Sequence, residues 1–197
     1  MCMKKMTRKG YCLMMSVMLT VFLGCGAGEN SGNRPEDVLP VLEGSREEGY
    51  TVRELDWGMT EEEVKSAIGK KEPESETDRL ILKSSKNGLQ LAEAYIFADE
   101  TKSGLVTVEY GWTADSDEEF RSVVKSLCSF AAQKMGTLDS GEEVTENTLL
   151  EKGTAAWTAS DNSTVNIMCS PQQKTIAVQI HGPREVPKTL VPSEADG

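Results

Sequence analysis

Apolar residues recur at helical spacing through residues 117–135. Ser116 and Glu119 have the spacing of a capping box just before this stripe, and Gly136 follows it as a stop signal. The pattern predicts a helix from about Asp117 to Met135 with one apolar side against the core. That side consists of Phe120, Val123, Val124, Leu127, Cys128, Ala131 and Met135.

A second, shorter helix is predicted earlier in the chain, from Glu61 to Ile68. Thr60 and Glu63 form a capping box, and Gly69 ends the pattern. The three acids at positions 61–63 suit the positive end of the helix dipole. This role explains them better than a metal site does, because no histidine stands nearby.

Six stretches have the composition and alternation of strands: 79–83, 89–98, 105–112, 155–159, 164–170 and 175–181. The second stretch mixes its pattern around Ala92 to Ala94, which predicts a bulge there. The order α-β-β-β-α-β-β-β predicts an α+β domain with two helices packed on one face of a mainly antiparallel sheet, the other face being wet. The repeated order is compatible with a degenerate duplication.

The composition changes on both sides of this domain. Residues 1–24 begin with a positive patch and continue as an uncharged apolar run, the order of a secretory signal peptide. The run is shorter than the roughly 20 residues that a membrane-spanning helix needs. Residues 25–49 are interpreted as a flexible tether, with docking of the patch Val38 to Leu42 on the domain as the alternative. The domain is assigned to 50–182, and 183–197 to an extended or disordered tail.

The end of the apolar run resembles the lipobox of bacterial lipoproteins. Leu23 and Gly24 fit the pattern before Cys25, while Phe22 stands where the family usually has leucine. Cys12 also lies in the signal but has no apolar run before it. The resemblance implies that Cys25 receives a lipid and that the mature bacterial protein is exported and anchored on the extracytoplasmic side of a membrane. The alternative is ordinary cleavage near Gly24 with Cys25 incidental.

The charge of the chain limits its partners. The sequence has 21 Lys and Arg against 32 Asp and Glu, a formal net charge of −11. Removal of residues 1–24 takes away four basic and no acidic residues, so 17 basic residues remain against 32 acidic ones, a net charge of −15. This excess argues against nucleic acid and against anionic lipid as direct partners.

A second resemblance concerns the start of the domain. The stretch from Trp57 to Thr60, followed by Glu63-Val64 and Ile68-Gly69, resembles the opening motif of small secreted and lipid-anchored bacterial domains. Members include the small lipoprotein of the outer-membrane assembly machine and the beta-lactamase inhibitor proteins. The resemblance covers about a dozen residues and implies a binding or scaffold domain rather than an enzyme.

Two cysteines remain after Cys25, and both fall on predicted core faces. Cys128 lies on the long helix and Cys169 on the fifth strand. Outside the cytoplasm a disulfide between them is chemically allowed, and two buried free thiols fit the placement equally well.

Other candidate chemistry is weaker. His181 is the only histidine, and alternation places it on the outer face of the last strand, so no zinc site and no Cys-His pair is expected. Ser122 and Lys125 match a Ser-x-x-Lys spacing, but the helix pattern puts them on the wet side without companion motifs. The run 115–117 is interpreted as a helix cap rather than a calcium loop. No metal or cofactor is expected.

The sequence therefore favours a lipid-anchored extracytoplasmic binding or scaffold domain that catalyses nothing. Its partners would be the membrane, through lipid on Cys25, and an envelope protein. An inhibitor of an extracellular enzyme and a hydrolase with an unrecognised site are the alternatives. Trp112 and Trp157 together with the wet sheet face are places to look for a binding surface, although core packing is the more ordinary role for tryptophan.

Overall fold

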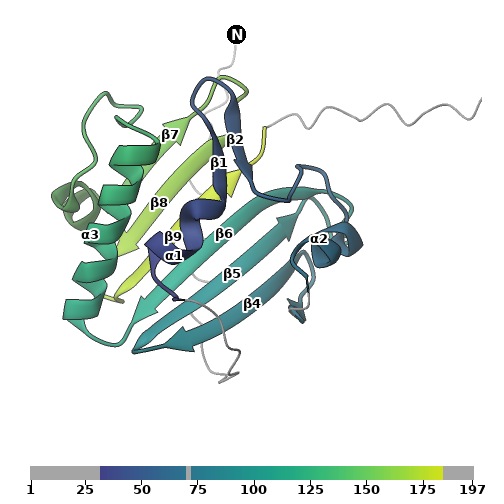
Figure 1. The fold of residues 1–197 in the computed structure, drawn as a ribbon, viewed down its shortest axis with the longest axis horizontal. Helices are drawn as coiled ribbons and strands as arrows, with labels where there is room; N and C mark the ends of the chain where they lie inside the picture. Colours follow the sequence, from purple (N-terminus) through teal and green to yellow (C-terminus); the bar gives the residue numbers. More distant parts are fainter. Residues whose placement is uncertain (1–31, 70–71, 184–197) are drawn as a thin grey trace, which may run out of the picture.

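One antiparallel sheet of seven strands forms the body of the protein, in the order β3-β4-β5-β6-β9-β8-β7 (Figure 1). The computed structural model describes residues 32–69 and 72–183. All six expected strands are present, and the α+β fold with helices on one face is confirmed. The bounds are β3 Glu74–Ser75, β4 Arg79–Lys86, β5 Leu89–Phe97, β6 Leu105–Ala114, β7 Thr154–Thr158, β8 Thr164–Ser170 and β9 Thr175–His181.

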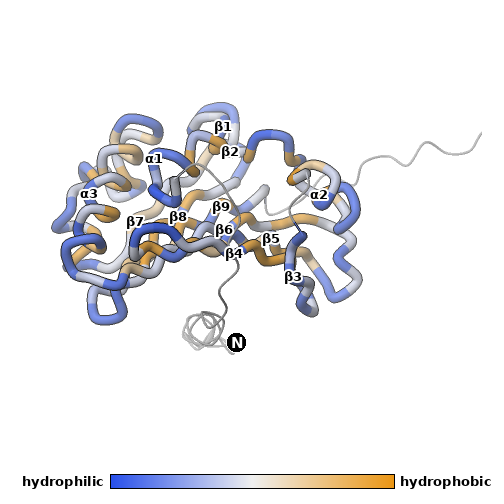
Figure 2. The backbone as a smooth tube through the Cα atoms, turned by 60° about the horizontal axis from the view of Figure 1, so that its bottom comes forward, coloured by the Kyte–Doolittle hydropathy of each residue, from blue (hydrophilic) through white to orange (hydrophobic). Residues whose placement is uncertain are grey.

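The helices and the apolar sides of the strands share one face of the sheet, which we call the covered face (Figure 2). The long helix α3, Asp117–Lys134, lies over β7 and β8 (Figure 1). The short helix α2, Glu61–Ala67, lies on the same face, towards the opposite edge of the sheet (Figure 1). Thr60 and Glu63 form the predicted capping box of α2, and Ser116 accepts a hydrogen bond from the Glu119 amide. Of the described helices, none is long and apolar enough to cross a membrane.

Residues 32–49 do not form the tether that their composition predicts. They contain a helical turn α1, Pro35–Val38, a short 3-10 turn η2, Leu39–Val41, and the strand β1, Leu42–Ser45, which pairs with β2, Gly49–Val52. Figure 1 shows these elements in front of the sheet, between α3 and α2. Their side chains Leu39 and Leu42 are buried in the core. The docking alternative for the patch Val38 to Leu42 thus agrees with the structure.

The β1–β2 hairpin is held by polar contacts to the far end of the chain. The Tyr50 amide donates to Ser163 Oγ at 2.7 Å, and Arg46 pairs with Asp139 at 2.5 Å. The Ser160 amide donates to the Arg46 carbonyl at 2.9 Å. The tether was predicted because these partners lie more than ninety residues away, where local composition carries no information about them.

Two further local expectations need correction. The register between β5 and β6 is continuous through Ala92 and Ala94, and its irregularity lies at Ile96/Phe97, where the strand ends. The mixed pattern at Ala92 to Ala94 reflects small side chains rather than a bulge. Residues 137–153, for which the sequence predicts no helix or strand, contain a turn of π-helix, η3 Thr148–Lys152, which ends at Gly153 with φ +73°.

Candidate functional site

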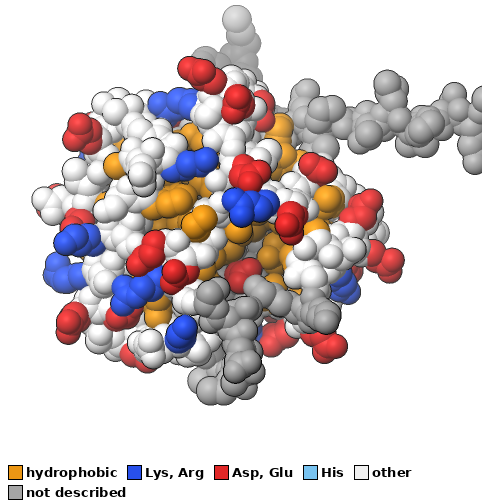
Figure 3. Space-filling view, in the orientation of Figure 1, with side chains coloured by type: hydrophobic (Ala, Val, Ile, Leu, Met, Phe, Trp, Pro, Cys, Tyr) orange, Lys and Arg blue, Asp and Glu red, His pale blue; other side chains and the backbone are white. Residues whose placement is uncertain are grey.

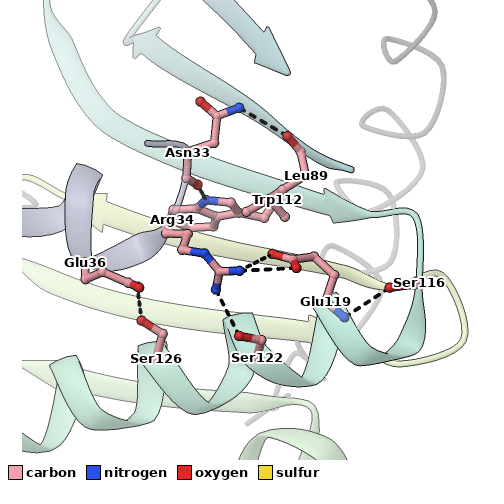
Figure 4. Close-up of polar contacts among 9 residues, drawn as sticks. All are labelled: Asn33, Arg34, Glu36, Leu89, Trp112, Ser116, Glu119, Ser122 and Ser126. Atoms are coloured by element: carbon pink, nitrogen blue, oxygen red, sulfur yellow. Dashed lines mark hydrogen bonds and ion pairs between the residues drawn. The ribbon is translucent and has the colours of Figure 1, made fainter. Parts of the chain in front are cut away.

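The first described residues dock where the sheet meets α3, and Asn33 is the centre of this junction (Figure 4). Asn33 Nδ2 donates to the Leu89 carbonyl at 3.1 Å, and Ser84 Oγ donates to Asn33 Oδ1 at 3.0 Å. The Asn33 carbonyl accepts a 2.6 Å hydrogen bond from the Trp112 indole N–H. Asn33 is therefore a buried polar residue whose side chain and carbonyl bind three sequence-distant residues of the sheet.

The next residues attach the segment to α3. The Arg34 guanidinium lies 3.0 Å from a carboxylate oxygen of Glu119 and donates to Ser122 Oγ at 2.9 Å (Figure 4). Ser126 Oγ donates to the carboxylate of Glu36. Pro35 occupies the first turn of α1, where its fixed φ suits a helix start. We refer to residues 33–36 as the N-terminal clamp.

A cavity of about 290 Å³ lies beside the clamp. Both signs of charge line it, with Arg34 and Lys86 against Asp37 and Glu119. Across the covered face as a whole, acidic and basic side chains are interspersed around apolar patches, without a large area of one sign (Figure 3). The cavity thus offers mixed polar contacts rather than a binding site for one charge.

The opposite, open face of the sheet carries a ladder of polar side chains on its central strands. Glu109 and Gln179 are paired across β6 and β9, and Gln179 Nε2 donates to Glu109 Oε2 at 2.7 Å. One row further, Thr107 Oγ1 lies 2.8 Å from His181 Nδ1. Burial raises the pKa of Glu109, which is only 4% exposed, and burial lowers the pKa of His181.

This face is less wet than the alternation of the strands predicts. Besides Glu109, the side chains of Ile81, Ala92, Ala94 and Thr107 are buried on it. Ala94 is short and lies between the longer side chains of Ile81 and Glu109, since opposed side chains are only about 5 Å apart. Ala92 lies between Lys83 and Gly111. The predicted placement of His181 on this outer face, away from Cys169, is confirmed by its register with Thr107 and Thr164.

A buried lysine joins α2 to the edge of the sheet. The Lys102 side chain is 8% exposed, and its Nζ lies 3.3 Å from Glu61 Oε2. Lys102 Nζ also donates to Ser75 Oγ on β3. In a catalytic Ser-Lys pair the amine must be free to take the serine proton, and here the Glu61 carboxylate engages Lys102 Nζ. The hydrogen bonds to Lys65 and Lys102 lower the pKa of Glu61, so this carboxyl is ionised.

Cys128 and Cys169 are both buried free thiols in the structure. Burial raises the pKa of each to about 11. Thiols with so little thiolate at neutral pH are poor nucleophiles. The arrangement agrees with the expectation of core-facing cysteines, and a disulfide between them in the oxidised protein stays a prediction.

The remaining predicted candidates have structural roles. Trp112 and Trp157 are 1% and 0% exposed, and Trp157 Nε1 donates to the Gly136 carbonyl at 3.2 Å. Both are buried on the covered face, so they have the core-packing role that the sequence favours for them, and a binding role for their side chains does not agree with the structure. Ser122 is engaged by Arg34 while Lys125 is exposed. Among the residues that the structure describes, no group of three or more His, Cys, Asp or Glu is placed to hold a metal ion.

The clamp residues and Lys102 were missed in the sequence. One signal could have found the clamp: Pro35 followed by Glu36 and Asp37 is a helix-start pattern inside the expected tether. No local signal marks Lys102, because its burial depends on α2 folding over it. Cys25 lies outside the described residues. Comparisons with protein-family models, with curated proteins and with solved structures found no match to this chain.

Proposed function

We propose that the protein is an exported, lipid-anchored domain that acts by binding or as a scaffold at the bacterial cell envelope, with the lipid on Cys25. The observation that carries the proposal is the lipobox-like ending at Cys25 after a charged and then apolar start. The clamp is compatible with it, because the contacts that fix the start of the described fold begin at Asn33, eight residues after Cys25 in the sequence.

A binding role is supported over a catalytic one by how the reactive groups are used. Ser122 binds Arg34, and Lys102 is paired with Glu61. The raised pKa values of Cys128 and Cys169 make both thiols unreactive at neutral pH. Glu109 and His181 have perturbed pKa values, but they occupy separate hydrogen-bonded pairs. Among the described residues named here, no nucleophilic side chain is paired with a base that could activate it.

The anchor is tested by replacing the proposed lipid site. Cys25→Ser should abolish incorporation of labelled fatty acid and release the domain from membranes, whereas the matched variant Cys12→Ser should keep both properties. Labelling that survives Cys25→Ser would show that the anchor is elsewhere. On the same detergent-solubilised membranes, a binding or scaffold role predicts a stoichiometric envelope partner in a pull-down. Loss of a partner enzyme's activity would identify an inhibitor.

A further inference from the structure

The sheet has two ends, and the clamp lies near one of them. This proximal end consists of the β4–β5 turn, the link from β6 to α3 and the β8–β9 turn. Backbone hydrogen bonds join them: the Asp115 amide donates to the Gly88 carbonyl at 3.0 Å, and the Ala114 amide to the Lys174 carbonyl at 3.1 Å. Asn33 is bonded to Leu89, the first residue of β5, so the chain enters the domain close to this end.

The distal end lies at the opposite ends of the same strands. It consists of the loop 98–104, the turn 159–163 and the start of α2, whose Glu61 amide donates to the Lys102 carbonyl at 3.1 Å. The last described residues, 182–183, follow β9 at this end. The chain therefore enters the domain near one end of the sheet and leaves it at the other.

The distance along the chain from Cys25 to the clamp is short. Asn33 follows Cys25 by eight residues, which span at most about 29 Å when fully extended. A flexible chain of that length has an r.m.s. span of about 15 Å. The nine residues of β5 rise about 30 Å from one end of the sheet to the other. Even fully extended, the connection is no longer than the sheet, so the proximal end stays closer on average to an anchor at Cys25 than the distal end does.

Both ends of the sheet carry charges of both signs. At the proximal end, Arg34 pairs with Glu119 and Lys174 lies 3.6 Å from Asp117. Lys86 is exposed at the end of β4, and Asp115, Asp117 and Glu118 are exposed in the link to α3 and its first turn. The distal end exposes Asp56, Glu62, Asp99 and Glu100, and its loop 98–104 also contains Lys102, which pairs with Glu61. Charge therefore does not distinguish the two ends, and the orientation depends on where the chain is attached.

We propose that the proximal end faces the bilayer and that the distal end points away from it, where an envelope partner can reach it. The proposal rests on the proposed lipidation of Cys25. In this orientation the lipid surface lies next to the turns 86–88 and 171–174. The polar contacts of Asn33 and Arg34 fix where the chain leaves the domain, so the orientation follows from a rigid attachment point and a short connection.

The test uses the full-length lipoprotein, purified in detergent and reconstituted into phosphatidylethanolamine–phosphatidylglycerol vesicles with nitroxide-labelled headgroups. A fluorophore is placed at an exposed proximal site by Gln172→Cys or at an exposed distal site by Glu100→Cys. The unsubstituted protein measures background labelling of Cys128 and Cys169. We expect the fluorophore at position 172 to be quenched several-fold more strongly than the one at position 100.

A matched variant controls for the length of the connection. Insertion of twenty Gly and Ser residues after Ala27 should remove most of the difference between the two sites, since the domain can then reorient. Equal quenching at both sites, or stronger quenching at position 100, in the protein without the insertion would overturn the orientation. Fatty-acid labelling of each sample separates this outcome from a failure of the anchor itself.

Discussion

The two faces of the sheet use polar groups in opposite ways. On the covered face, Asn33 and the Trp112 indole enter the core with hydrogen bonds to specific distant partners. On the open face, Glu109 is buried in a row of small and polar side chains and has Gln179 as its hydrogen-bond partner. The covered face therefore gains stability from its polar contacts, whereas the open face retains a carboxyl whose ionisation is disfavoured.

The two faces should differ most in how much stability is lost when a side chain is shortened, because the covered face contains the large buried apolar side chains. Leu127 on α3 is fully buried against the sheet, so Leu127→Ala should lower the free energy of unfolding by about 2–5 kcal/mol. Asn166→Ala on the open face should change it by less than about 0.5 kcal/mol. Urea-induced unfolding followed by tryptophan fluorescence measures both. Similar losses in the two variants would mean that the open face is packed as tightly as the covered one.

A smaller loss is expected where the clamp meets the sheet. Asn33→Ala removes the side-chain hydrogen bonds to Leu89 and Ser84 and leaves the buried Leu89 carbonyl without this donor. The free energy of unfolding should fall by about 1–3 kcal/mol. Gln172→Ala in an exposed turn serves as the control and should leave the unfolding midpoint in urea unchanged. An Asn33 variant as stable as this control would show that the clamp does not contribute to the fold.

The smallest effect should appear on the open face, with the opposite sign. Burial raises the folded-state pKa of Glu109 above its usual 4.5, so folding favours the protonated form. The contribution of this group to stability is fully present below the unfolded pKa and is lost as the pH rises through the raised folded pKa. Glu109→Gln should thus stabilise the domain at neutral pH, by about 1 kcal/mol, and have little effect in acid.

The control for this prediction is an exposed acid. Glu100→Gln at the distal end should not reproduce the pH-dependent gain, because the Glu100 side chain is exposed. Urea unfolding of both variants between acid and neutral pH makes the comparison. A Glu109 variant that is less stable than the original protein at neutral pH would show that the bond to Gln179 needs the charge.

The parts of the fold that follow from neighbouring residues could be predicted from the sequence. Both main helices have local caps, and β8 and β9 alternate cleanly, so their positions were found to within a residue or two. The hairpin β1–β2 and the clamp are stabilised by Ser163, Asp139 and Glu119, which lie far along the chain. A polar composition at residues 25–49 therefore indicated a tether, although tertiary contacts order most of it.

The candidate sites also divide into features that local sequence patterns predict and features that depend on distant contacts. The core-facing side of Cys128 and Cys169 and the outward side of His181 follow from periodicity alone. The burial of Lys102 does not, because it requires α2 and β3 to meet over one ammonium group. Core packing of Trp112 was the favoured role, but its indole partner was not predictable, since it is a backbone carbonyl 79 residues earlier.

The clamp also has a consequence for the order of folding. Residues 33–36 are synthesised before the elements that they contact, and the partners that hold them follow 51 to 90 residues later in the chain. Contacts of such long sequence separation form slowly, because the closure of a long loop must precede any gain from them. The clamp is thus made early during synthesis and is among the last parts of the domain to dock.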